Sequence, residues 1–171
     1  AGRVDPPSGR LGSTFFNATS QPASQGCAAV PAGIYLLGDA DGTLDDDADE
    51  FDESVIAHEL GHYYEALLAR SDSVGGPHTL LSVLDPRVAL SEGFGNAFQG
   101  LVLGDRVYRD ALGSTGNRVF FFDLDRLSQP VRSVRDYYSE ACVGELLWDF
   151  ADADDQQDVD RDQLGLGFPA L

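Results

Sequence analysis

The stretch His58-Glu59-Leu60-Gly61-His62 determines how the rest of the chain is interpreted. On a helix, residues four apart lie one above the other on the same face, so both imidazoles point the same way. Such a pair suits Zn²⁺, which hydrolases usually hold with three protein ligands and a water molecule. Glu59, beside the pair, would take the proton from that water as it attacks a carbonyl group. The motif predicts zinc ligands His58 and His62 and the general base Glu59.

The residues around the motif predict that it lies inside a helix. Residues 51–54 supply an N-cap acid and further acid in the first turn, just before the apolar run 55–57. Apolar side chains then recur with a helical period as far as Ala69, and the polar, glycine-rich residues 71–77 break the chain. The alternative is a solvated helix that carries two histidines by chance.

A second helix is predicted from Asp85, an N-cap followed by proline, to near Gly104. Glu92 is the only acid inside this segment, and its neighbours are small or apolar. A buried lone carboxylate is costly unless a positive charge compensates it, as a metal ion does. We therefore expect Glu92 to be the third ligand, with a glutamate at a wet helix surface as the alternative. Asn96, one turn further on, would hold a ligand histidine through its second ring nitrogen.

This HExxH motif, followed by a helix that carries a glutamate, resembles the thermolysin-like zinc metallopeptidases, the gluzincins. The resemblance implies a zincin-like α+β fold, with a strand-rich N-terminal part, the active-site helix and a mainly helical C-terminal part. It also implies zinc-dependent hydrolysis of peptide bonds. Two departures stand out. The family carries aspartate where this chain has Asn96, and the interval of 92 − 62 = 30 residues implies a larger insertion around 75–85.

The resemblance extends upstream to two predicted strands. Residues 16–18, Phe-Asn-Ala, and residues 34–42 are similar to the family's edge strand and to the strand that leads to the active-site helix. By that likeness Asn17 and Ala18 would pair with the backbone of a bound peptide as an added strand. The order of elements, strands before Asp52 and helices after it, fits a zincin fold.

Length and composition favour one metallopeptidase-like catalytic domain over residues 1–171, large enough for a core. The chain begins at Ala1 and contains no methionine, so we expect a processed piece of a larger secreted parent. A net charge of −18 would repel nucleic acids and anionic membranes, and it suits an extracellular or cell-surface location. No apolar run approaches the length of a membrane span.

Acidic residues are concentrated in 39–52 and again in 149–162. Ca²⁺ takes six to eight oxygen ligands from loops of this kind, although neither cluster has the spacing of an EF-hand. The predicted calcium ligands are Asp39, Asp41, Asp45 and Asp47. A solvated acidic loop is the alternative.

The remaining features are weaker. Cys27 and Cys142 permit one disulfide, and two buried free thiols are the alternative. Residues 133–151 are predicted to form a third helix with a broad apolar stripe. Tyr137 and Tyr138 are expected to be core residues of this stripe; the alternative is that the hydroxyl group of one of them supports an oxyanion at the zinc site. Residues 119–122 form an apolar strand or buried turn.

His78 lies between the ligand helices, whereas the family's transition-state donor follows the third ligand. We therefore leave His78 out of the predicted site, with a role at the site as the alternative. The sequence thus predicts a secreted zinc endopeptidase that acts on peptide or protein substrates. The alternative is an extracellular binding module or pseudo-peptidase that retains zinc for structure. A structural site would have four protein ligands, whereas a catalytic site keeps one position open.

Overall fold

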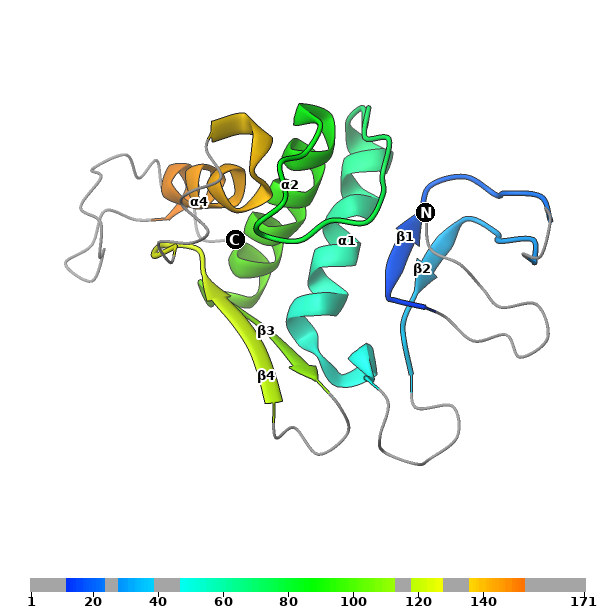
Figure 1. Cartoon of the computed structure of the whole chain (residues 1–171), viewed down its shortest axis with the longest axis horizontal. Coiled ribbons are helices and arrows are strands. Elements are labelled where there is room, and N and C mark those ends of the chain that lie inside the picture. The colour runs from blue at the N-terminus through cyan, green and yellow to red at the C-terminus, as the bar shows by residue number, and fades with distance from the viewer. Residues whose placement is uncertain (1–11, 24–27, 39–46, 113–117, 128–135, 153–171) are drawn as a thin grey trace.

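The computed structural model describes residues 12–23, 28–38, 47–112, 118–127 and 136–152 (Figure 1). Within them the fold is α+β. It comprises the helices α1 (Glu53–Leu68), α2 (Pro86–Leu103) and α4 (Glu140–Ala151), the short 3-10 helices η1 (Asp49–Phe51) and η2 (Asp136–Tyr138), and two small antiparallel sheets. Helix α2 lies between α1 and α4 (Figure 1). In this described part, none of the helices is long and apolar enough to cross a membrane.

Helix α1 confirms the predicted helix around the HExxH motif. Asp52 is the N-cap residue, but its side chain does not cap the helix. Its Oδ2 instead accepts a hydrogen bond of 2.9 Å from the backbone N–H of Ala111, which ties the start of α1 to a strand far along the chain. The buried face of α1 includes His58, Glu59 and Gly61, so the motif points into the molecule.

Helix α2 confirms the predicted boundaries. The Asp85 side chain accepts a hydrogen bond of 2.9 Å from the backbone N–H of Arg87, and Gly104 ends the helix in the left-handed conformation with φ 64°. The approach to α1 is close, because a Cβ added at Gly61 would lie 3.2 Å from the Cα of Gly95. Two glycines thus bring the two helices together, side by side.

The two sheets differ from the expected order of strands before helices. Strands β1 (Phe15–Asn17) and β2 (Gly33–Tyr35) pair with each other beside α1, whereas β3 (Val107–Leu112) and β4 (Arg118–Asp123) form a second antiparallel pair after α2. The predicted order, strands before Asp52 and helices after it, therefore holds only in part, because β3 and β4 follow α2 in a C-terminal part that is otherwise helical. Cross-strand stacking of Tyr108 on Phe122, with ring centroids 4.9 Å apart, stabilises this pair.

The predicted strand over residues 34–42 is also shorter than expected, since β2 ends at Tyr35. Residues 39–42 lie outside the described part. The apolar residues 119–122 belong to β4. Of the two predicted alternatives, strand or buried turn, the strand is therefore confirmed.

The third helix begins later than predicted. Ser139 is the N-cap of α4, and its Oγ accepts a hydrogen bond of 3.3 Å from the backbone N–H of Cys142. A serine in that position stops a helix from continuing backwards. Tyr137 and Tyr138 therefore lie in η2, are 58% and 41% exposed, and are not core residues of a helical stripe. Residues 133–135 lie outside the described part.

Candidate metal centre

Three predicted ligands converge between α1 and α2. The Nε2 atoms of His58 and His62 are 3.0 Å apart, and each lies 3.2 Å from Oε2 of Glu92. All three side chains are nearly buried. Ligands that surround a tetrahedral zinc ion at its usual bond lengths are separated by about 3.3 Å. Two imidazoles and a carboxylate in this arrangement can therefore hold a metal ion after only small adjustments.

The charges of these side chains compensate one another. Burial alone would raise the pKa of Glu92, but hydrogen bonds from His58 and His62 and their positive charge lower it well below its usual range. Burial alone would lower the pKa of His62, but contacts with Glu65 and Glu92 raise it to about 10. A divalent cation would take over this compensation, and its binding would displace a proton from the imidazoles.

The outward-facing nitrogens of both histidines are also held. Asn96 Oδ1 lies 3.0 Å from Nδ1 of His58, the place that the sequence predicted for it. Ser91 Oγ lies 3.3 Å from Nδ1 of His62 and donates a hydrogen bond of 2.6 Å to Oε2 of Glu65. An oxygen acceptor at Nδ1 keeps the proton there and leaves Nε2 free to bind a metal.

Ser91 and Glu65 are not among the residues predicted from the sequence, although both positions carry a signal. Glu65 follows His62 by three residues, which places both on one face of α1. Ser91 directly precedes Glu92 and is buried among small residues of α2.

Glu59 lies beside the three ligands. It is 8% exposed, and its Oε2 is a buried oxygen that no hydrogen bond satisfies among the described residues. Burial raises the pKa of Glu59, while His58, His62 and a backbone hydrogen bond from Phe16 partly oppose this shift. A buried carboxylate with an unused oxygen is suited to accept a proton from a nearby water.

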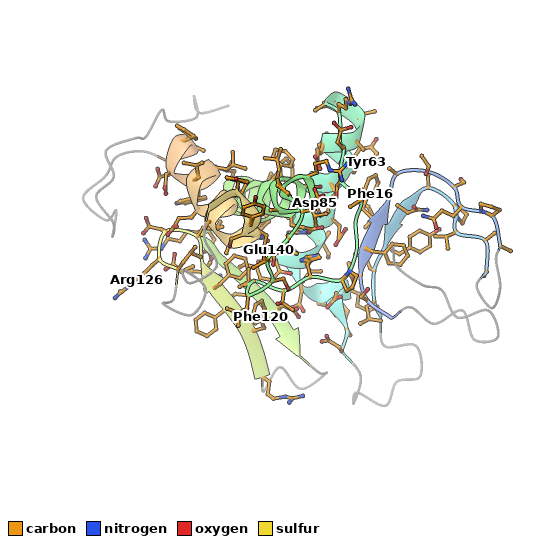
Figure 2. The ribbon with its side chains drawn as sticks, turned by 45° about the horizontal axis from the view of Figure 1, so that its top comes forward. Phe16, Tyr63, Asp85, Phe120, Arg126 and Glu140 are labelled. Atoms are coloured by element: carbon orange, nitrogen blue, oxygen red, sulfur yellow. The ribbon has the colours of Figure 1, made fainter. Side chains whose placement is uncertain are left out.

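Strand β1 passes close to this carboxylate. Phe16 packs edge-to-face on Tyr63 of α1, with ring centroids 6.2 Å apart, where β1 meets the helix (Figure 2). The Asn17 side chain points inward and donates to the carbonyl groups of Val30 and Pro31 at 3.2 and 3.0 Å. Ala18 is exposed just after the strand. Any contact of these residues with a peptide would thus use the backbone rather than the Asn17 amide.

The structure brings a third histidine close to the centre. The connection between α1 and α2 folds back across both helices (Figure 1) and carries His78 to Glu92, where Nε2 and Oε2 are 3.3 Å apart. The other ring nitrogen, Nδ1, lies 2.6 Å from Oε2 of Glu140 at the start of α4. Burial alone would lower the pKa of His78, but Glu140 and Glu92 raise it.

The site predicted from the sequence includes neither His78 nor Glu140. Their one signal is composition, since His78 is the third of only three histidines in the chain.

The predicted calcium loop is described only at one end. Three of its predicted ligands lie outside the described residues: Asp39, Asp41 and Asp45. Asp47 lies with Asp49 and Asp110 in a group whose oxygens are within 4.8 Å of one another. Asp49 is buried and accepts a hydrogen bond from the Thr14 hydroxyl. Burial, followed by repulsion from Asp49, Asp47 and Asp52, raises the pKa of Asp110 to about 6.

The predicted disulfide cannot be followed in space, because Cys27 lies outside the described residues. Cys142 is half-buried in the first turn of α4.

The chain matches no protein-family model, no curated protein and no solved structure. The case for a gluzincin-like centre therefore depends on the residues of the site.

Proposed function

We propose that this chain is the catalytic domain of a secreted zinc-dependent endopeptidase with a gluzincin-like ligand set. One observation carries the proposal. The ligand atoms of His58, His62 and Glu92 converge within 3.2 Å of one another, directly beside a buried Glu59 oxygen that has no hydrogen-bond partner in the described part of the chain. Metal-assisted hydrolysis needs both a three-ligand site and a base next to it.

Each residue then has a distinct role. Zn²⁺ held by His58, His62 and Glu92 would polarise the scissile carbonyl and lower the pKa of a water molecule towards about 7. Glu59 accepts the proton of the attacking water at Oε2 and later delivers it to the nitrogen of the leaving amine. Because burial raises the pKa of Glu59, this carboxylate is a stronger base than an exposed glutamate.

Strand β1 is the proposed place for the substrate backbone. Among the described residues it pairs only with β2, so its other edge has no strand partner. The backbone hydrogen bond from Phe16 to Glu59 brings β1 to the base. An extended peptide added to this edge would present its carbonyl groups close to the centre. The net charge of −18 supports an extracellular or cell-surface location.

The competing function is a binding module or pseudo-peptidase with a structural zinc ion. Such a site has four protein ligands. Within the described ranges, the group that converges at the centre contains the three residues His58, His62 and Glu92. His78 contacts Glu92 but does not join that group, which favours an open, catalytic position.

The test combines metal analysis with one substitution. Wild-type protein purified without chelator should contain one zinc ion and cleave a library of unstructured peptides. Glu59→Gln should retain the zinc and lose cleavage, whereas Glu53→Gln, at the exposed start of the same helix, should behave as wild type. Cleavage by Glu59→Gln at the wild-type rate would exclude this mechanism. Zinc without cleavage in the wild-type protein would favour the structural function.

A further inference from the structure

Glu140 is a buried carboxylate that the three-ligand centre does not explain. The residue is 3% exposed and lies in the first turn of α4. Its Oε2 atom is buried and has no hydrogen-bond partner among the residues that the structure describes. A carboxylate oxygen in such a position is costly unless a positive charge compensates it. The position of Glu140 therefore points to a cation that binds there.

Ligand atoms of two further residues lie around this oxygen. Nδ1 of His78 is 2.6 Å from Oε2 of Glu140, and Nε2 of the same ring is 3.3 Å from Oε2 of Glu92. One ligand atom from each of the three residues lies within 4.8 Å of the other two. The short contact of His78 with Glu140 is not a hydrogen bond, since Oε2 of Glu140 has no partner of that kind. An imidazole and two carboxylates thus form a second group of metal-binding side chains.

The packing of α4 on α2 brings Glu140 to Glu92 (Figure 1). Gly93 directly follows Glu92, and a Cβ added at Gly93 would lie 2.9 Å from the carbonyl oxygen of Glu140 and 2.6 Å from Cβ of Val143. A residue with a side chain would therefore push the two helices apart. The glycine lets the start of α4 approach α2 beside the ligand, so the neighbouring positions of the two carboxylates follow from the helix contact.

The connection between α1 and α2 holds His78 against these carboxylates. The N–H of Leu84 donates to the carbonyl of Tyr138 at 2.9 Å, which ties the connection to η2. Leu80 packs against the small buried cluster that includes Ala141 of α4. The His78 side chain itself is 30% exposed, so its ring can rotate while the backbone around it stays in place.

We infer that His78, Glu92 and Glu140 bind a second divalent metal ion, which shares Glu92 with the zinc ion of the first site. The inference goes beyond the proposed peptidase function and depends on it only through the shared ligand. A carboxylate has two oxygens with about four lone-pair positions, so Glu92 can bind two ions. Imidazole and carboxylate ligands together suit first-row divalent ions such as Zn²⁺. Two ions about 3.5 to 4 Å apart would form a two-metal site.

The second ion should bind more weakly than the first. It gains only two ligands that are its own, His78 and Glu140. The 2.6 Å between their ligand atoms is also shorter than the separation of about 3.3 Å around a tetrahedral zinc ion, so the exposed ring must move by roughly 0.7 Å as the ion enters. Protein purified without added metal should therefore contain the first zinc ion alone.

An ion pair between a protonated His78 and Glu140 is the competing explanation. Such a pair would compensate the buried carboxylate without a metal. A charged pair of this kind is normally joined by a short hydrogen bond. Oε2 of Glu140 is the oxygen nearest to the ring contact, and no hydrogen bond satisfies it within the described part of the chain. The geometry therefore favours the metal.

Calorimetry with two variants tests the inference. Wild-type protein that contains its first zinc ion is titrated with zinc chloride, in excess Mg²⁺ to occupy surface carboxylates, and should bind one further ion per chain. His78→Ala and Glu140→Gln each remove a ligand of the second ion. Both should keep the first zinc ion and weaken the second binding event by more than about 100-fold, the upper effect of losing a mere orienting partner.

Each variant has a matched control. Glu53→Gln removes an acid from the first turn of α1, as Glu140→Gln does from the first turn of α4. Thr79→Ala changes the exposed neighbour of His78. Both controls should bind the second ion as wild type does. Crystals of wild type grown with excess zinc should show two anomalous-scattering peaks about 3.5 to 4 Å apart beside Glu92, and crystals of His78→Ala should show one.

The outcomes separate this inference from the proposed function. A wild-type protein that binds no zinc contradicts the first site and with it the peptidase. A wild type that keeps one zinc ion and binds no further ion overturns only the second site and leaves the ion pair of His78 with Glu140. A second ion that His78→Ala and Glu140→Gln both retain, or that Glu53→Gln also loses, lies elsewhere and overturns the inference as well. If Glu140→Gln does not fold, His78→Ala still decides, because the His78 side chain is partly exposed in a connection between helices.

Discussion

The substitution Gly95→Ala should strongly weaken metal binding through a single added methyl group. Gly95 lies on α2 directly against the His58 ring, and a Cβ at this position would be 2.8 Å from the ring carbon Cε1 and 2.9 Å from each ring nitrogen. Carbon atoms normally approach to about 3.5 Å, so the ring must move by roughly 0.7 Å. The ring has little freedom to do so, because its Nδ1 is held by Asn96.

The expected loss of zinc affinity follows from how little a metal site tolerates displacement of its ligands. A metal site accepts errors of only about 0.2 Å in its bond lengths. A displacement of roughly 0.7 Å in one of three ligands should weaken zinc binding by at least the 10 to 100-fold that loss of an orienting partner causes. Stability should change less. Alanine favours a helix over glycine by about 1 kcal/mol, and overpacking costs about 1 to 3 kcal/mol.

Gly100→Ala is the matched control on the same helix. Its Cβ would lie 2.7 Å from Leu124 and 2.9 Å from Trp148, a similar clash away from the metal ligands. Both variants should lose a few degrees of melting temperature. Only Gly95→Ala should lose zinc affinity, measured by competition with a chromophoric chelator. If both variants bind zinc equally well, the close packing of Gly95 on His58 has no role in forming the site.

Three further predictions address the surroundings of the centre. Asn96→Ala should keep the fold and weaken zinc binding about 10 to 100-fold in the same competition assay, and Asn96→Asp should restore it. In the presence of a chelator, Asp110→Asn should raise the melting temperature at pH 8 but not at pH 4. The pKa of Asp110 is raised to about 6, so folding favours its protonated form, and the stability of the wild-type protein falls as the pH rises from about 4 to 6. Calcium should raise the melting temperature of wild type more than sodium chloride at equal ionic strength, and Asp110→Asn should lose this difference; equal effects of both salts would mean an acidic loop without a bound ion.

The helices that carry the ligands could be predicted because their signals are local. The N-cap at Asp85, the left-handed end at Gly104 and the helical period around the HExxH motif each depend on residues within a turn or two. Glu92 could be selected by a chemical argument, as a lone acid on an apolar helix. The short distance between Glu92 and His62 could not be predicted, because it depends on how closely Gly61 lets α1 and α2 approach each other.

Other features depend on contacts between distant segments. The pairing of β3 with β4 follows from cross-strand aromatic contacts that alternation alone did not reveal. The apolar period extends the predicted third helix back across Ser139, whereas this serine caps α4 and so moves Tyr137 and Tyr138 out of the helix. Asp110 joins the acids near α1 only because β3 runs beside that helix.

His78 illustrates why a motif describes only part of a candidate metal centre. Helical geometry fixes the angle between His58 and His62, so their chemistry can be inferred from spacing. His78 has no fixed relation to them in sequence, since the turn that carries it is placed by Leu80 packing on α4. Glu140, from a third helix, lies against the same ring, so these side chains come together only once α1, α2 and α4 have packed against one another.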